Sequence, residues 1–276
     1  MRSASPLRYP GGKWRIAPFF EQLIRLNELG ARRYIEPYAG GASLALSLLF
    51  GNQVSEVHLN DLDPAINAFW SAVLNNNGEL RDLIRATPVT PEEWARQKRI
   101  YAKGHSAGAL AFGFATFFLN RTNHSGILNG GMIGGKDQTG IWKVDARFNK
   151  PELLRRIERI GSYKNRIHLS CLDAVQFLAD LKPSRDSFVY LDPPYYRAGS
   201  ELYLNAYSLE DHAEVRKSVR RLRAPWVVSY DDVPEIRRLY RAVKSRRLEL
   251  LHTARCLRLG KEVLFFSSGL RIPVRS

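Results

Sequence analysis

The sequence predicts an α/β fold with a doubly wound, mostly parallel sheet. Short apolar runs that resemble buried strands alternate with stretches of helical periodicity. This alternation is typical of a parallel sheet covered by helices on both faces. A segment in the middle of the chain, residues 77–150, breaks the alternation. We therefore expect one α/β domain built from residues 1–76 and 151–276, with a separate subdomain inserted between them.

The strands are expected at the apolar runs 32–37, 55–61, 165–171, 187–192, 224–230, 247–253 and 262–268. Helical patterns lie near 13–29, 43–50, 64–76, 151–160, 173–181, 208–222 and 234–242. Only a short link separates the last two strands, so we expect them to pair as an antiparallel hairpin.

The inserted segment contains two helical stretches, "PEEWARQKRIYAKG" and "ALAFGFATFFLNR", followed by a Gly-rich polar stretch without a regular period. We therefore expect a mostly helical subdomain. Insertions between the strands of a sheet often carry binding functions, because the rigid sheet positions them.

The chain is strongly basic. It has 42 Lys and Arg residues against 27 Asp and Glu, a net charge of +15 and a sequence pI near 10.0. A surplus of this size favours polyanionic partners, since binding releases their counterions. The alternative is a generally basic protein whose surface arginines are only solvated.

Composition excludes several other classes. No run of residues approaches the roughly 20 apolar positions that a membrane span needs, and the N-terminal stretch lacks the apolar core of a secretion signal. The two cysteines, Cys171 and Cys256, are far apart, and there is no CxxC or HxxxH pair. We therefore expect a cytoplasmic protein without a disulfide framework or a metal site.

Two motifs point to a nucleotide-like ligand. "YIEPYAGGAS" (34–43) reads as a strand, a Gly-containing turn and a helix, whose backbone can approach a ligand closely. About 20 residues further on, Asp61 ends the next strand, where an acid can accept hydrogen bonds from ribose hydroxyls. Asp63 precedes Pro64 and reads as a helix N-cap. The pairing of turn and acid indicates an adenosine site, although the turn alone could be structural.

The stretch "FVYLDPPYYR" (188–197) ends a buried strand with an acid, two prolines and two tyrosines. Two prolines fix the backbone twice and remove two N–H donors. The stretch therefore presents two hydrogen-bond acceptors, the Asp192 carboxylate and the Pro193 carbonyl. The ring of Tyr195 provides a stacking surface beside them. Such acceptors suit methyl transfer to an exocyclic amine of a base, because they draw the nitrogen towards a tetrahedral shape. The base must leave the helix to reach them.

Together, "YPGGKW", "IEPYAGGAS", "NDLDP", "FFLNRTN" and "LDPPYY" resemble the DNA adenine-N6 methyltransferase family, and within it the Dam-type group. The match runs in order from about residue 7 to 268. The resemblance implies a methyltransferase-type fold, S-adenosylmethionine as methyl donor, base flipping, and double-stranded DNA as substrate. It implies a catalytic domain at 1–76 and 151–276 and a target-recognition subdomain at 77–150. We expect a monomer, with a restriction endonuclease as an optional partner in a restriction-modification system.

The resemblance also implies site residues. The expected catalytic residues are Asp192, Pro193, Pro194 and Tyr195. The expected cofactor contacts are Tyr9, Gly12, Lys13, Pro37, Tyr38, Gly40, Gly41, Asp61, Leu62, Asp173 and Asp192; for Asp173, an N-cap role is an equal alternative. The expected DNA contacts are Asn120, Arg121, Asn123, His124, Ser125, Asn129 and Lys136. Only "LNRT" (119–122) matches the family here, and "NHSGILNGG" departs from its GATC-reading members. Beyond that match our hypothesis is that His124 and Ser125 fill the space left by a flipped base, and that Asn129 or Lys136 reads base edges.

Three alternatives stay open from the residues. The first is the same chemistry on cytosine N4 or on adenine in RNA, and the second is a basic DNA-binding relative without catalysis. The third, a nicotinamide dehydrogenase, lacks the GxGxxG spacing. "GGMIGGKD" (130–137) has the spacing of a phosphate-binding loop, but Asp137 follows the lysine and no strand precedes the motif, which argues against that function.

Overall fold

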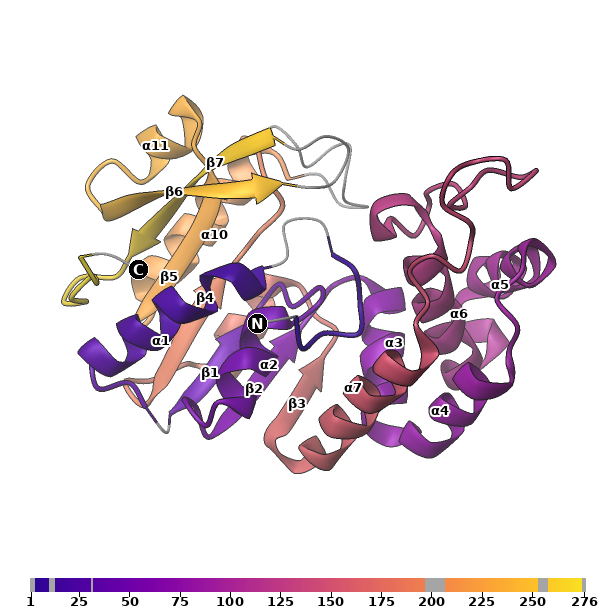
Figure 1. Ribbon diagram of the computed structural model, residues 1–276. Helices are drawn as coiled ribbons and strands as arrows, with labels where there is room; N and C mark the ends of the chain where they lie inside the picture. The colour runs from indigo at the N-terminus through magenta and orange to yellow at the C-terminus, as the bar shows by residue number, and fades with distance from the viewer. Residues whose placement is uncertain (1–2, 10–12, 31, 197–206, 253–257, 275–276) are drawn as a thin grey trace. The chain divides into compact units, whose positions relative to one another are not determined.

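The computed structural model of the protein describes residues 3–9, 13–30, 32–196, 207–252 and 258–274. The chain forms two compact units (Figure 1). Unit 1 comprises Met1–Gly12 and Asp63–Asn165, and unit 2 comprises Lys13–Leu62 and Arg166–Ser276. The compact units therefore change over at 12/13, 62/63 and 165/166, whereas the sequence suggested functional boundaries at 76/77 and 150/151. The helices on either side of the insertion belong to the same compact unit as the insertion.

Unit 2 contains a seven-stranded sheet in the order β3-β2-β1-β4-β5-β7-β6. Its strands are β1 (Arg33–Glu36), β2 (Glu56–Asn60), β3 (Ile167–Ser170), β4 (Ser187–Leu191), β5 (Trp226–Asp231), β6 (Lys244–His252) and β7 (Arg258–Phe266). The first five strands pair in parallel, and β7 pairs antiparallel with both β5 and β6. This confirms the mostly parallel sheet and the C-terminal hairpin. β6 and β7 begin three and four residues before the predicted apolar runs. Their antiparallel pairing extends from Lys244 opposite Phe266 to His252 opposite Arg258, and so includes polar residues at the start of each strand.

Helices cover both faces of this sheet, as expected. The helices of unit 2 are η1 (Lys13–Ile16), α1 (Ala17–Leu26), α2 (Ser43–Phe50), α8 (Ala174–Leu181), α10 (Leu209–Arg221) and α11 (Pro234–Leu239). On one face, Phe20 of α1 packs against Phe188 and Tyr190 of β4. On the other face, Val189 and its neighbours pack against α8, α10 and α11. The alternation along β4 is the period of two that a strand buried on both faces shows.

The strand order reverses between β1 and β4, which lie side by side and lead to opposite halves of the sheet. Ligands of open α/β sheets bind outside the carboxyl ends of the strands at such a switch point. β1 ends at Glu36 and β4 ends at Leu191. The glycine turn and the Asp-Pro-Pro-Tyr stretch therefore begin at neighbouring strand ends, although about 150 positions separate them in sequence.

Unit 1 is helical in its described residues. It contains α3 (Pro64–Asn75), α4 (Asn77–Ala86), α5 (Pro91–Lys103), η2 (Gly104–Ala107), α6 (Ala109–Thr122), η3 (His124–Gly126) and α7 (Lys150–Ser162), with η4 (Lys164–Arg166) at the boundary of the two units. α6 is apolar around most of its circumference and forms the centre of the unit. Gly113 lets α6 approach α3 closely, since a Cβ there would lie 2.5 Å from the Ala68 carbonyl oxygen. These helices confirm the mostly helical insertion.

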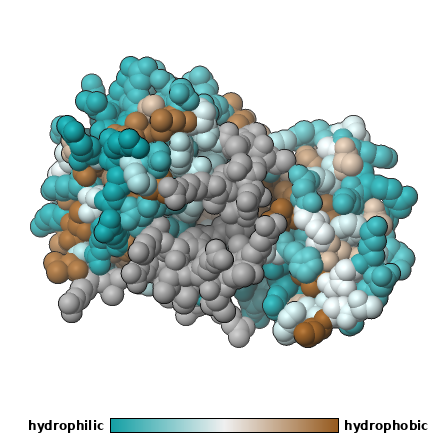
Figure 2. Space-filling model, turned by 90° about the horizontal axis from the view of Figure 1, so that it is seen from above, coloured by the Kyte–Doolittle hydropathy of each residue, from teal (hydrophilic) through white to brown (hydrophobic). Residues whose placement is uncertain are grey.

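The surface is mainly polar. On the face seen in Figure 2, hydrophilic residues cover most of the described surface, and hydrophobic residues form small separate groups. The large apolar side chains that are exposed include Leu62 and Leu172 in unit 2 and Ile141 and Trp142 in unit 1. Within the described part of the chain, no helix has both the length and the apolar character that crossing a membrane requires.

Candidate active site

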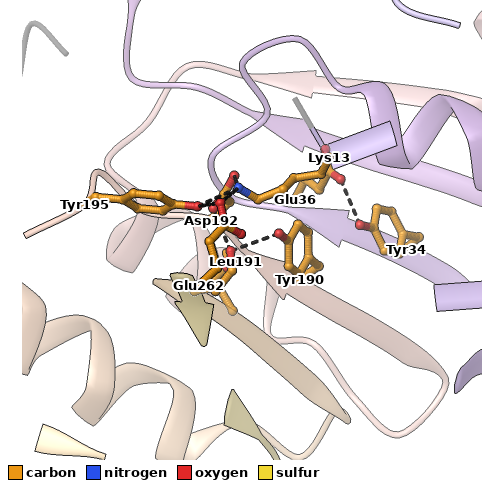
Figure 3. Close-up of polar contacts among 9 residues, drawn as sticks. Lys13, Tyr34, Glu36, Tyr190, Leu191, Asp192, Tyr195 and Glu262 are labelled. Atoms are coloured by element: carbon orange, nitrogen blue, oxygen red, sulfur yellow. Dashed lines mark hydrogen bonds and ion pairs between the residues drawn. The ribbon is translucent and has the colours of Figure 1, made fainter. Parts of the chain in front are cut away.

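Asp192 lies at the end of β4 and is held on both carboxylate oxygens (Figure 3). Its Oδ1 accepts a hydrogen bond of 2.6 Å from Ser229 Oγ in β5, and its Oδ2 lies 3.1 Å from Lys13 Nζ. The Tyr190 hydroxyl lies 2.9 Å from Ser229 Oγ and completes a chain of hydroxyls that leads to the carboxylate. Asp192 keeps 23 % of its side chain exposed. The carboxylate is therefore fixed in direction but remains accessible to a ligand.

Lys13 and Glu262 form the other half of this site. Lys13 Nζ donates to the Tyr195 hydroxyl at 2.6 Å and lies 3.2 Å from Glu262 Oε1, and the Tyr195 hydroxyl donates to the same oxygen at 2.5 Å. Lys13 and Glu262 are buried, with side chains 6 % and 1 % exposed. One ammonium group therefore lies between two carboxylates, and Tyr195 is anchored through its hydroxyl. Glu262 and Ser229 were not expected from the sequence. The one feature that indicates Glu262 is its position as an acid directly before the apolar run "VLFFSS".

Lys13 and Glu262 change the pKa of Asp192 in opposite directions. Burial raises the pKa of Asp192, the Lys13 ammonium lowers it, and the Glu262 carboxylate raises it again. Low-dielectric surroundings strengthen each of these interactions. The ionisation of Asp192 therefore depends on Lys13 being charged and close.

Glu36, which ends β1, is a further buried acid near Asp192. The Tyr34 hydroxyl donates to Glu36 Oε1 at 2.7 Å (Figure 3). Burial raises the pKa of Glu36 to about 8, and the Asp192 charge adds to the rise, while the Tyr34 hydrogen bond opposes it. Glu36 is therefore mostly protonated at neutral pH. Glu36 was not among the site residues expected from the sequence.

The glycine turn and the acid of the next strand are in direct contact. The Gly40 backbone amide donates to Asp61 Oδ2 at 2.7 Å. Gly40 and Ala42 both have a φ of 47°, a left-handed conformation that glycine adopts without strain and alanine does not. The turn thus brings its backbone onto the carboxylate that the sequence pointed to, and it does so at the carboxyl ends of β1 and β2.

Asn60 ties together three strand ends beside this turn. Its buried side-chain amide donates to the Pro37 carbonyl at 3.0 Å and to the Leu172 carbonyl at 2.9 Å. Its Oδ1 accepts from the Leu172 amide at 3.0 Å. The segments after β1, β2 and β3 are therefore held in a fixed relation by one side chain. Asn60 was not expected from the sequence, in which the one indication is an amide side chain directly before Asp61.

Apolar and polar groups at these strand ends suit a nucleoside. Leu62 and Leu172 follow β2 and β3 and are 43 % and 40 % exposed, which is unusual for leucines beside a buried sheet. The Tyr38 hydroxyl lies 3.3 Å from that of Tyr207. Asp173 caps α8 by accepting from the amides of residues 175 and 176, in agreement with its expected N-cap role. An acid that contacts the glycine turn, exposed leucines and tyrosine hydroxyls are groups of the kind that a nucleoside ligand requires.

The three expected cofactor residues near the N-terminus differ in position. Lys13 belongs to the Asp192 and Tyr195 group described above. Tyr9 is a residue of unit 1, and Gly12 lies outside the described residues. Asp63 caps α3 with a hydrogen bond from the Ala65 amide, and Pro64 is the first helical residue, as the sequence predicted.

Comparison with known families decides the class of this site. The model of the D12 class N6 adenine-specific DNA methyltransferases matches residues 9–253. The chain belongs to this family. It is therefore an adenine-specific DNA methyltransferase whose methyl donor is S-adenosylmethionine, as the motifs predicted. The family match decides against the cytosine-N4, RNA and dehydrogenase alternatives.

Individual relatives are distant. The chain is 23 % identical over 228 residues to the type II methyltransferase M.MjaIII of Methanocaldococcus jannaschii, and the match covers 76 % of each chain. A suggested RNA methyltransferase of Pyrococcus horikoshii gives a TM-score of 0.44 at 14 % identity, over 95 % of this chain and 85 % of that one. A suggested methyltransferase of Escherichia coli gives 0.38 at 10 % identity, over 92 % and 86 %. The family assignment rests on the family match alone.

Two of the expected DNA-contacting residues of this methyltransferase are engaged inside unit 1. Asn120 is buried; its Oδ1 accepts from the Arg8 amide at 2.7 Å, and its Nδ2 donates to the Arg8 and Gly126 carbonyls. Asn123 is also buried; its Oδ1 accepts from Trp94 Nε1 at 2.6 Å, and its Nδ2 donates to the carbonyls of residues 127 and 128. This geometry favours a role in shaping the loop over direct contact with DNA.

The other expected DNA-contacting residues, apart from the largely buried Arg121, are more exposed. His124, Asn129 and Lys136 are exposed, and Ser125 is half-buried with a φ of 56°. Arg121 donates to the Arg147 carbonyl. Burial and the charges of Arg8, Arg156 and Arg147 lower the pKa of Arg121 to about 9. Unit 1 therefore contains a cluster of like-charged arginines, which an anion would stabilise.

Proposed function

We propose that this adenine-specific DNA methyltransferase acts on adenine within a specific sequence of double-stranded DNA, after rotating the base out of the helix. The observation that carries the proposal is the Asp192 carboxylate at the switch point of the sheet. Asp192 is fixed by Ser229 and Lys13, remains partly exposed, and is followed by two prolines without N–H groups. We refer to residues Asp192 to Tyr195 as the Asp-Pro-Pro-Tyr corner. An amine inside an intact base pair would be out of reach of this partly buried segment, which favours base flipping.

The S-adenosylmethionine of this family supplies, when bound, an electrophilic methyl group on its sulfonium. We assign its adenosine part to the strand ends around Gly40, Asp61 and Leu62. The Asp61 carboxylate would accept from the ribose hydroxyls, since a carboxylate oxygen that already accepts from the Gly40 amide retains another lone pair. Pro37, Tyr38, Gly41 and Asp173 complete the proposed site. Asn60 positions this site and does not contact the cofactor.

Asp192 and Pro193 orient the target amine. The N6 amine of adenine is a weak nucleophile because its lone pair is delocalised into the ring. If the Asp192 carboxylate and the Pro193 carbonyl each accept one N–H bond, the lone pair is directed away from both acceptors and towards the methyl group. Preorganised acceptors of this kind need no rearrangement during the reaction. Pro194 keeps the corner rigid, because its ring fixes φ.

Tyr195 and Lys13 complete the corner. The Tyr195 ring is proposed to stack on the flipped base, and its hydroxyl, held by Lys13 and Glu262, limits rotation of the ring. Lys13 keeps Asp192 ionised, so that the carboxylate accepts a hydrogen bond from the amine. After transfer, the methylated ammonium loses its proton readily, so Asp192 need not act as a strong base.

We propose unit 1, with residues 77–150 at its centre, as the target-recognition part. Its arginine cluster offers charge for DNA phosphates, and phosphate contacts supply affinity rather than sequence information. The exposed side chains of His124, Asn129 and Lys136, with Ser125 beside them, are the candidates for reading bases. Asn120 and Asn123 would support the loop that carries them.

A monomer that acts alone or beside a restriction endonuclease is the simplest arrangement. The type II name of the distant relative M.MjaIII supports a place in a restriction-modification system. The cytoplasmic location expected from the cysteine content agrees with a DNA substrate and stays a prediction.

The test is methyl transfer from isotopically labelled S-adenosylmethionine to duplex DNA of random sequence, followed by hydrolysis to nucleosides. The label is expected in N6-methyladenosine of the deoxy series, and sequencing of the modified duplex would give the recognised word. Label in N4-methylcytosine, or transfer only to RNA, would contradict the proposal. Cofactor binding without any transfer would indicate a non-catalytic DNA-binding relative.

A further inference from the structure

Two histidines and a glutamate, to which no role has been assigned above, meet on one face of the sheet. Glu56 and His58 lie two positions apart on β2 and therefore point to the same face. His168 lies on β3, directly opposite His58 in the parallel register. The two imidazole rings stack with their centroids 4.4 Å apart. β3 is the edge strand of the sheet, so the group joins the edge to its neighbour.

The three side chains already converge through the atoms that bind metals. Glu56 Oε1 lies 3.0 Å from His58 Nε2, and Glu56 Oε2 lies 3.3 Å from His168 Nε2. One potential ligand atom from each of the three residues lies within 4.8 Å of the other two. In a tetrahedral zinc site with bonds of about 2.0–2.1 Å, neighbouring ligand atoms lie roughly 3.3 Å apart. The two nitrogen–oxygen distances are close to this value but involve different oxygens of Glu56, so one ion would be bound after small rotations of the carboxylate and of the rings.

We propose that Glu56, His58 and His168 bind a divalent transition metal ion of the zinc class. The ion would replace the protons that the imidazoles share with the carboxylate, and water would fill the remaining position. Two imidazoles and one carboxylate are a ligand set that suits zinc, and strand residues hold their Cβ positions rigidly. The bound ion would cross-link the edge strand β3 to its neighbour β2.

The surroundings of the group allow such an ion. His168 is 48 % exposed and Glu56 is 31 % exposed, so an ion has access, whereas His58 is 13 % exposed and anchors the inner side. Arg33 is the nearby cation that acts on His58. Its guanidinium lies 3.2 Å from Asp186 Oδ2, which offsets part of its charge. The sequence did not suggest this site, because its ligands come from two strands separated by more than 100 positions.

The test measures binding of Zn²⁺ and Co²⁺ to the full chain with Cys171→Ser and Cys256→Ser, so that no thiolate contributes. Zinc is expected to bind at about one equivalent per chain, with micromolar or tighter affinity in competition with a chromophoric chelator. Cobalt is expected to show the visible absorption bands of a four-coordinate ion. The unfolding temperature is expected to be higher with zinc than with a chelator.

His168→Ala and Glu56→Gln are each expected to weaken zinc binding at least about tenfold, since even the loss of an outer-shell partner of a ligand typically costs about that much. His105→Ala is the matched control, since His105 is an exposed histidine of unit 1 and none of the three ligands belongs to that unit, and it should leave zinc affinity unchanged. Equal zinc affinity in the parent chain, His168→Ala and Glu56→Gln would overturn the proposal, as would the absence of saturable binding by the folded parent chain.

Discussion

Lys13 Nζ lies 3.1 Å from Asp192 Oδ2 and 3.2 Å from Glu262 Oε1, so a single ammonium group bridges two carboxylates from distant parts of the chain. Asp192 comes from the end of a central parallel strand, and Glu262 comes from the antiparallel strand β7. Because burial raises the pKa of Asp192 and Lys13 opposes the rise, the ion pair controls the protonation state of the carboxylate that is proposed to hold the target amine. The first two predictions concern this group.

Removal of the Asp192 carboxylate is expected to abolish methyl transfer. Loss of one positioned acceptor typically costs ~10²-fold or more in rate, because the remaining groups no longer orient the nucleophile. Asp192→Ala should therefore transfer methyl groups at least about a hundredfold more slowly while it binds duplex DNA with nearly normal affinity. The measurements are single-turnover transfer and a DNA-binding titration on the same preparation. Turnover above about a tenth of wild type would contradict the role given to Asp192.

Replacement of the two partners of Asp192 should shift the pH–rate profile in opposite directions. Lys13→Met removes the charge that lowers the pKa of Asp192, so the acid limb of the profile should move to higher pH. Glu262→Gln removes a charge that raises the pKa, so the limb should move to lower pH. The profile of kcat/KM against pH reports this group in the free enzyme. A shift of both variants in the same direction would show that these two charges do not set the ionisation of Asp192.

Loss of the Asp61 carboxylate should weaken cofactor binding. Asp61→Ala is expected to reduce the affinity for S-adenosylmethionine by roughly 1–3 kcal/mol, the range for hydrogen bonds to a charged group, measured by isothermal titration. Asp63→Ala is the matched control. Asp63 caps α3, so its loss should lower the free energy of unfolding by ~0.5–2 kcal/mol and leave cofactor affinity unchanged. Equal affinities of Asp61→Ala and wild type would remove Asp61 from the cofactor site.

The buried amide of Asn123 should matter for stability more than for DNA contact. Asn123→Ala removes the side-chain partner of the Leu128 carbonyl and of the Trp94 indole N–H, while the Ile127 carbonyl keeps the hydrogen bond from the Gly130 amide. Each unsatisfied buried group typically costs ~1–3 kcal/mol, so unfolding by denaturant should show a clear loss of stability. Exposed Asn129 provides the comparison: Asn129→Ala should keep wild-type stability and weaken binding of duplex DNA. A stable Asn123→Ala variant with a DNA-binding defect alone would reverse these assignments.

Glu36 should make the protein less stable as the pH rises from about 4.5 to about 8. The folded state raises the pKa of Glu36 from its ordinary 4.5 to about 8. Between these values the folded protein holds a proton that the unfolded chain has released, so unfolding becomes easier with increasing pH. Glu36→Gln imitates the protonated acid and should flatten this part of the stability curve. Urea unfolding of both proteins across this pH range provides the measurement, and parallel curves would contradict the expected protonation.

Local pattern was enough for much of the fold. Periodicity placed all seven strands and the flanking helices, because a strand buried on both faces and an amphipathic helix differ in the spacing of their apolar residues. Asp63 before Pro64 was read correctly as an N-cap, since capping depends only on neighbouring residues. The functional boundary of the insertion stays a prediction. The contact boundary differs from it because α3 and α7 bury their apolar faces against the inserted helices, and sequence pattern does not reveal the partner of such a face.

By itself, the sequence determined the order of the motifs, the adenine-N6 class and the identity of the Asp-Pro-Pro-Tyr corner, because each depends on residues that are close together in the chain. Only the tertiary structure brought Lys13 to Glu262 across 249 positions and Asn60 to Leu172 across 112. It also placed Glu56 and His58 beside His168. Such groups form because folding buries charges and polar atoms next to whatever partners the strand order supplies, and a buried polar group without a partner is costly.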